Sequence, residues 1–123
     1  MAPEDLIKEA IVAQKRAEAP YSNYSVGAAI LTIDNLVILG CNIESKAYPT
    51  TLCAERVAIF SAISQGYKDF SAMALITQDG AFPCGSCRQI IYEYSGNISI
   101  YIAKDLDNYV TQTISDLLPF PFG

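Results

Sequence analysis

The chain has 123 residues, four cysteines, no histidine and a formal net charge of −5 at pH 7. Its length fits one domain, and an acidic balance without a basic cluster argues against binding to a nucleic-acid backbone. The absence of histidine excludes Ser-His-Asp and Cys-His catalysis and mixed Cys/His zinc sites. Acid–base chemistry must therefore come from Asp, Glu, Lys, Tyr or a metal-bound water.

Periodicity and turn residues divide the chain into helices and strands. The expected helices are residues 3–18, 53–65 and 84–94, with a last short turn beginning at 115 or 116. The expected strands are residues 24–33, 36–39, 72–77, 98–103 and 109–114. After the first helix the order is strand–strand–helix–strand–helix–strand–strand, which predicts the α/β class with helices packed on a mixed sheet.

Two further expectations concern burial and location. The helix over 53–65 is expected to present Val57, Ala58, Phe60 and Ile63 to the core. The acidic first residues lack the basic and apolar regions of a signal peptide, and no apolar run reaches the roughly 18 residues of a membrane span. We therefore expect a cytoplasmic protein with reduced thiols and no membrane partner.

Two short stretches combine three of the cysteines with an acid and a base. Cys53 is followed by Glu55 and Arg56, and Cys84 and Cys87 form a Cys-x-x-Cys pair further along the chain. Each stretch begins a predicted helix that crosses between parallel strands, so the two helix starts can meet at one edge of the sheet. Three thiolates suit zinc and leave its fourth tetrahedral position to water. We predict one zinc ion per chain held by Cys53, Cys84 and Cys87, with Glu55 as the proton shuttle.

The charge of such a site predicts a role for Arg56. Three thiolates on a divalent ion leave a net charge of about −1, which weakens the ion as an acid for its water. Helix N-termini favour thiolates, and a guanidinium is a further counterweight. We expect Arg56 to hydrogen-bond ligand sulfurs, and the remaining thiol, Cys41, to be a buried structural residue.

Each of these residues also has a plainer interpretation. Cys84 and Cys87 alone could form a redox pair or half of a structural zinc site, and Cys53 alone is more often a buried apolar thiol. A structural zinc module needs a fourth protein ligand, and no histidine exists to supply it. A dithiol redox protein leaves Cys53 and Glu55 without a role. The combination therefore favours a catalytic zinc site.

The combined pattern resembles a zinc-dependent cytidine deaminase of the small, three-cysteine type. The signature is Cys53-Ala54-Glu55 followed by Pro83-Cys84-x-x-Cys87. The similarity covers nearly the whole chain, in the segments 19–22, 26–29, 40–44, 53–56, 83–89 and 117–119. It implies that residues 1–123 form a single cytidine deaminase-like domain. The implied fold is a three-layer α/β/α sandwich, with a mixed five-stranded sheet that ends in an antiparallel hairpin.

The resemblance also implies an activity, the hydrolysis of cytidine and deoxycytidine to uridine and deoxyuridine with release of ammonia, as in pyrimidine salvage. Zinc-bound hydroxide would attack C4 of the base while Glu55 moves the protons. Asn42 and Glu44 would hold the sugar hydroxyls. Ala54 would offer its backbone to the base, and Tyr24 stands where the family usually has Phe against the substrate.

The resemblance further implies a homotetramer in which neighbouring chains complete each site. Tyr48 and Phe122 match positions of such cross-subunit contributors, although loop and C-terminal aromatics are ordinarily packing residues. A polynucleotide deaminase is the nearest rival, but such enzymes usually place a helix where residues 104–108 predict a hairpin turn. An aminonucleoside antibiotic stays open as a substrate. Glu44 disfavours a nucleotide, because a carboxylate beside the sugar repels its phosphate.

Overall fold

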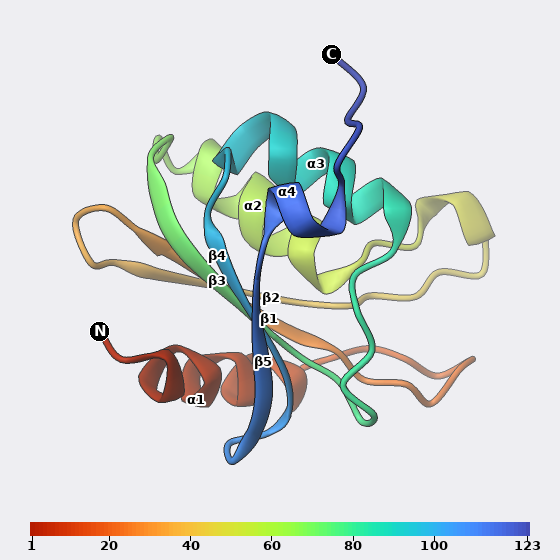
Figure 1. Cartoon of the computed structure of the whole chain (residues 1–123). Coiled ribbons are helices and arrows are strands. Elements are labelled where there is room, and N and C mark those ends of the chain that lie inside the picture. Colours follow the sequence, from red (N-terminus) through yellow and green to blue (C-terminus); the bar gives the residue numbers. More distant parts are fainter.

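The computed structural model describes residues 1–123 and contains one five-stranded mixed sheet with the strand order β2-β1-β3-β4-β5 (Figure 1). The β3–β4 pair is parallel, and the other pairs are antiparallel. The strands are β1 (Gly27–Thr32), β2 (Val37–Cys41), β3 (Phe70–Ile76), β4 (Ser99–Asp105) and β5 (Asn108–Thr113). The predicted order of the strands along the chain, the mixed five-stranded sheet and the final antiparallel hairpin are confirmed.

Helices cover both faces of the sheet and make three layers (Figure 1). Helix α1 (Pro3–Gln14) packs on one face in an apolar cluster that includes Leu6, Ile7 and Leu31. The opposite face carries a second cluster under α2 (Ala54–Ser64), α3 (Gly85–Ser95) and α4 (Ile114–Leu117). A short 3-10 helix, η1 (Tyr48–Thr50), precedes α2. None of the helices combines the length and apolar character needed to cross a membrane.

Helix α1 is shorter than the sequence pattern suggests and ends at Gln14 rather than residue 18. The reason is a backbone pairing between residue 18 and the segment after β2. The Glu18 N–H donates to the Asn42 carbonyl at 3.0 Å, and the Glu44 N–H donates to the Glu18 carbonyl at 2.8 Å. These bonds require an extended chain at Glu18, so the helix must stop before it.

The buried face of α2 matches the expectation only in part: Ala58 is buried and Ile63 packs against the core, but Phe60 does not lie in the core. The side chains of Ala54, Ala58, Ile59 and Ala62 face the sheet, whereas Phe60 is 40% exposed. Val57 and Ile63 are half-buried. Small side chains on the inner face allow the helix to pack directly on β1 and β2, which explains why the larger Phe60 is not on that face. Cys41, expected to be buried, is also only half-buried at the end of β2.

Candidate active site

The starts of α2 and α3 bring three thiols together. Cys53 and Cys84 are the residues immediately before the first turns of α2 and α3, and Cys87 lies in the first turn of α3. The three sulfur atoms all lie within 4.8 Å of one another. Zinc–sulfur bonds of about 2.3 Å in a tetrahedron place sulfurs roughly 3.8 Å apart, so the group fits a zinc ion with little adjustment. No fourth acidic or thiol side chain belongs to the group, which leaves one position for water.

The electrostatics of the thiols also fit a cation. A hydrogen bond from the Cys87 thiol, helped by Arg56, lowers the pKa of Cys53 to about 5. The pKa of Cys87 is raised, because its thiol donates that bond and is buried next to Glu55. The protein by itself therefore stabilises a thiolate at Cys53, and a bound cation would favour ionisation of Cys87.

Arg56 makes the contact that its position predicts. Its Nη2 donates a hydrogen bond to the Cys53 sulfur at 3.3 Å. The Cys53 thiolate in turn raises the pKa of the guanidinium, which stays charged. The Arg56 Nε atom is buried without a hydrogen-bond partner, so the position of this side chain carries a desolvation cost. Its effect on the metal stays a prediction.

Glu55 is buried beside the thiols at the start of α2. Its side chain is only 4% exposed. Burial raises the pKa of the carboxyl group, and the negative charge of Cys53 acts in the same direction. A buried carboxyl group with a raised pKa is suited to both accepting and returning a proton.

A cavity of about 490 Å³ connects the thiol group to the predicted sugar-binding residues. Its walls include Cys53, Glu55 and Cys84 as well as Asn42 and Glu44. Ala54, Tyr24 and Tyr48, all predicted from the sequence, also line it, and Phe122 does not. No lysine or arginine is among the lining residues, so nothing in the wall would neutralise a phosphate.

Asn42 and Glu44 are fixed by the turn that precedes β1. The Asn42 side chain donates to the Tyr24 carbonyl at 2.7 Å and accepts from the Val26 N–H at 2.9 Å. The Glu44 carboxylate accepts from the N–H groups of residues 21 and 22, at 2.9 and 3.1 Å, and from the Ser22 hydroxyl. The Ser22 bond is the largest cause of the lowered pKa of Glu44, so this side chain is a carboxylate at neutral pH.

The two predicted cross-subunit residues are exposed. Tyr48 is 86% exposed at the cavity wall, and Phe122 is 84% exposed in the C-terminal segment. The Gln89 side chain exchanges two hydrogen bonds with the Phe122 backbone, at 2.7 and 3.0 Å. The C-terminal segment is thereby attached to α3, while the Phe122 side chain remains exposed.

Sequence reasoning missed two residues that support the site. The Arg88 guanidinium donates to the Pro83 carbonyl at 2.7 Å and to the Leu117 carbonyl at 2.8 Å, which ties the loop before Cys84 to α4. Asp79 accepts a hydrogen bond from the Tyr24 hydroxyl. The position of Arg88 next to Cys87 gave a weak indication of its role. Nothing in the sequence indicated the role of Asp79, because its partner Tyr24 is 55 residues away.

Comparison with known proteins agrees with this geometry. The sequence model for the cytidine and deoxycytidylate deaminase zinc-binding region matches residues 2–103. The chain belongs to this deaminase family. A cytidine deaminase of Sporosarcina psychrophila is 42% identical over 123 residues, which cover 98% of this chain and 90% of the relative. A cytidine deaminase structure from Burkholderia pseudomallei covers 99% of this chain and 100% of its own, with 38% identity and a TM-score of 0.95.

A blasticidin-S deaminase of Bacillus cereus is also similar, with 32% identity over 82% of this chain and 79% of the relative. The family and the three-sulfur group together identify zinc as the cofactor of this deaminase. The chain is therefore a zinc-dependent hydrolytic deaminase with the α/β fold expected from its sequence.

Proposed function

We propose that this deaminase hydrolyses the free nucleosides cytidine and deoxycytidine to uridine and deoxyuridine with release of ammonia. The observation that carries the proposal is the shared cavity, whose wall includes two of the three thiols (Cys53 and Cys84), Glu55 and two candidate sugar-binding residues but no cationic side chain. Such a cavity can hold a base and a sugar together and offers nothing to a phosphate. The similarity to cytidine deaminases supports the same substrates.

In the proposed mechanism Cys53, Cys84 and Cys87 hold the zinc ion. When bound, zinc supplies a Lewis acid that activates water for addition to C4 of the base. Glu55 accepts a proton from that water, delivers it to N3 of the ring and then assists proton transfer to the departing amine. Its burial keeps bulk solvent from competing for the proton. One water is consumed and one ammonia released for each nucleoside.

The sugar end of the proposed site has limited bonding capacity. A carboxylate accepts roughly four hydrogen bonds, and the backbone and hydroxyl groups of the 21–22 turn already supply three to Glu44. Glu44 Oε2 therefore keeps one acceptor position for a sugar hydroxyl. Asn42 keeps one N–H and one lone pair after bonding Tyr24 and Val26. If the site recognises mainly one sugar hydroxyl, a sugar that lacks another hydroxyl can still bind. This supports turnover of both ribonucleosides and deoxyribonucleosides.

An aminonucleoside antibiotic is a second candidate substrate, because one of the similar proteins is a blasticidin-S deaminase. Ammonia release should be compared across cytidine, deoxycytidine, cytidine monophosphate and blasticidin S. We expect turnover of the first two and at least about tenfold lower kcat/KM for the monophosphate, since a phosphate meets carboxylates and no cation. A preference for blasticidin S or for the monophosphate would contradict the proposed substrate class.

We also propose that the enzyme is a cytoplasmic homotetramer in which Tyr48 and Phe122 complete sites of neighbouring chains. The high exposure of both rings supports a role in contacts between chains. Thiol ligands need a reducing compartment, which supports the location. Sedimentation equilibrium should give four chains per particle, and a monomer with full activity would contradict the assembly.

A further inference from the structure

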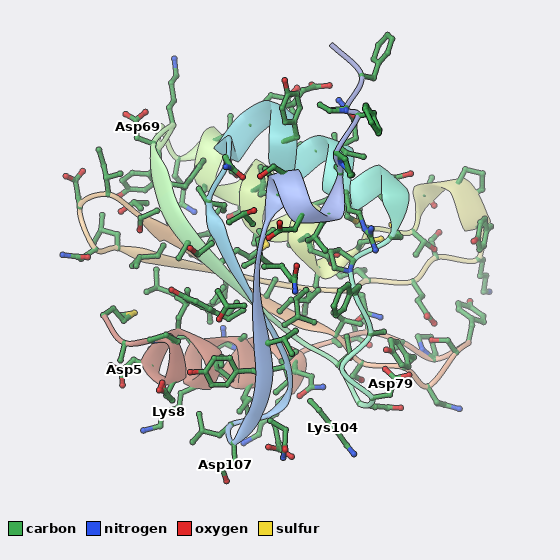
Figure 2. All side chains as sticks on the ribbon, in the orientation of Figure 1. Asp5, Lys8, Asp69, Asp79, Lys104 and Asp107 are labelled. Atoms are coloured by element: carbon green, nitrogen blue, oxygen red, sulfur yellow. The ribbon has the colours of Figure 1, made fainter.

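The Tyr24 hydroxyl forms a hydrogen bond with a residue that is distant in the sequence, and no sequence motif accounts for this bond. Tyr24 belongs to the turn before β1 and lines the cavity. Its hydroxyl donates to Asp79 Oδ1 at 2.5 Å, across 55 residues of sequence. Asp79 lies near the tip of the loop that joins β3 to α3 (Figure 2). That loop continues through Phe82 and Pro83 to Cys84, all of which line the same cavity.

Asp79 is also the centre of the hydrogen bonds inside this loop. Its Oδ1 accepts from the Thr77 hydroxyl at 3.3 Å and from the Ala81 N–H at 3.2 Å, and the Ala81 N–H also donates to Thr77 Oγ1 at 2.9 Å. The Tyr24 bond is the largest cause of the lowered pKa of Asp79, which is therefore ionised. A carboxylate acceptor makes the Tyr24 hydrogen bond stronger than one between neutral groups.

A second hydrogen bond joins the same two segments of the chain. The Gln78 side chain donates to the Asn23 carbonyl at 2.9 Å. The turn on the other side of this contact holds the candidate sugar-binding residues, because the Tyr24 carbonyl accepts from Asn42 and the Ser22 hydroxyl donates to Glu44. The turn at 21–24 thus connects the sugar-binding wall to the loop that carries Cys84.

We propose that the Tyr24–Asp79 hydrogen bond is a strut that holds the Tyr24 ring and the 77–83 loop in the geometry that binds the nucleoside. Asp79 is then a positioning residue that acts through Tyr24. The part of the inference that concerns the nucleoside rests on the proposed function. The strut lowers KM, because it fixes two walls of the cavity before the substrate arrives. It has little effect on kcat, because neither side chain touches the reacting atoms in the proposed mechanism.

The strut is tested with Tyr24→Phe, Asp79→Ala, Asp79→Asn and the Tyr24→Phe/Asp79→Ala double variant. Tyr109→Phe is a matched control, because its hydroxyl donates to the Glu4 carboxylate at 3.3 Å in a contact between β5 and α1. Steady-state kinetics with cytidine should show KM raised about 5- to 15-fold in Tyr24→Phe and in Asp79→Ala, with kcat within about twofold. The double variant should be no worse than either single variant.

Asp79→Asn should recover part of the loss, because its amide oxygen can still accept from Tyr24. Hydrogen exchange of the peptide that spans 77–83 gives a readout independent of turnover. We expect faster exchange in Tyr24→Phe and Asp79→Ala than in the wild type, and no change in Tyr109→Phe. Unchanged exchange, an unchanged KM or additive losses in the double variant would each overturn the strut. Absence of cytidine turnover by the wild type would instead overturn the proposed substrate, and the exchange data would still decide whether the strut exists.

Discussion

Gly40 on β2 lies so close to Ala54 on α2 that a Cβ at residue 40 would stand 2.4 Å from the Ala54 carbonyl oxygen. The same Cβ would be 2.4 Å from the Ala58 backbone nitrogen. These backbone atoms belong to the helix that carries Glu55 and begins just after Cys53. The distance between an edge strand and the catalytic helix is thus set by the absence of one side chain.

Gly40→Ala should therefore impair both stability and activity. The α2 backbone atoms that the added methyl group would meet cannot rotate away, so α2 must shift from the sheet. We expect a loss of about 1–3 kcal/mol in the free energy of unfolding and at least about a tenfold loss in kcat. Gly66→Ala is the control: it sits at the end of α2 with φ +96° and open space around it, so it should cost stability alone. A Gly40→Ala variant with wild-type kcat would show that the spacing of α2 is not critical.

Arg88→Ala should weaken zinc retention. The variant leaves the carbonyls of Pro83 and Leu117 without their charged donor, so the loop before Cys84 loses its attachment to α4. We expect the free energy of unfolding, measured with urea, to fall by about 2 kcal/mol. We also expect a lower zinc content after dialysis against a chelator. Arg88→Lys should not restore both bonds, because a single ammonium lacks the fork geometry. Arg16→Ala, a change in an exposed turn, is the control for loss of positive charge.

Glu55→Gln should retain zinc and the fold but lose about 10²- to 10⁴-fold in kcat. The amide has nearly the same shape as the carboxyl group and cannot accept the proton from water. Zinc content, circular dichroism and ammonia release from cytidine measure the three properties on one sample. Turnover near the wild-type rate would refute the proton-shuttle assignment.

Arg56→Gln should weaken catalysis more than stability. Removal of the guanidinium leaves the Cys53 sulfur without its charged donor and makes the thiolate site more negative. We expect about a tenfold loss in kcat/KM and a change of less than about 1 kcal/mol in unfolding free energy. Loss of folding with zinc still bound would reverse this ranking.

The sequence predicted the parts of the fold that depend on local pattern and crossover geometry. The Cys-x-x-Cys pair and Cys53 were placed at helix starts, and the structure brings their sulfurs within 4.8 Å. The β4–β5 hairpin followed from a connection too short for a helix, and Asp105 and Asn108 now flank a two-residue turn. Both are local or topological constraints, which a single sequence contains.

Other features depend on contacts between distant residues. The end of α1 is set by the pairing of Glu18 with Asn42, and the inner face of α2 by close packing on β2 rather than by residue size. Phe60 is expected in the core from the sequence. In the structure it lies near the surface and packs edge-to-face with Tyr94, with 6.0 Å between the ring centroids. The partner of the Tyr24 hydroxyl could be found only once the fold had placed residue 79 beside it.

The central claim is that one zinc ion per chain, held by the three cysteines, is required for deamination of cytidine. The direct test is a zinc titration of chelator-treated enzyme, with ammonia release from cytidine measured at each step. Activity should rise in proportion to bound zinc and reach its maximum at about one ion per chain, whereas a Cys87→Ala variant should stay inactive. Full activity of zinc-free enzyme, or wild-type activity in Cys87→Ala, would contradict the account.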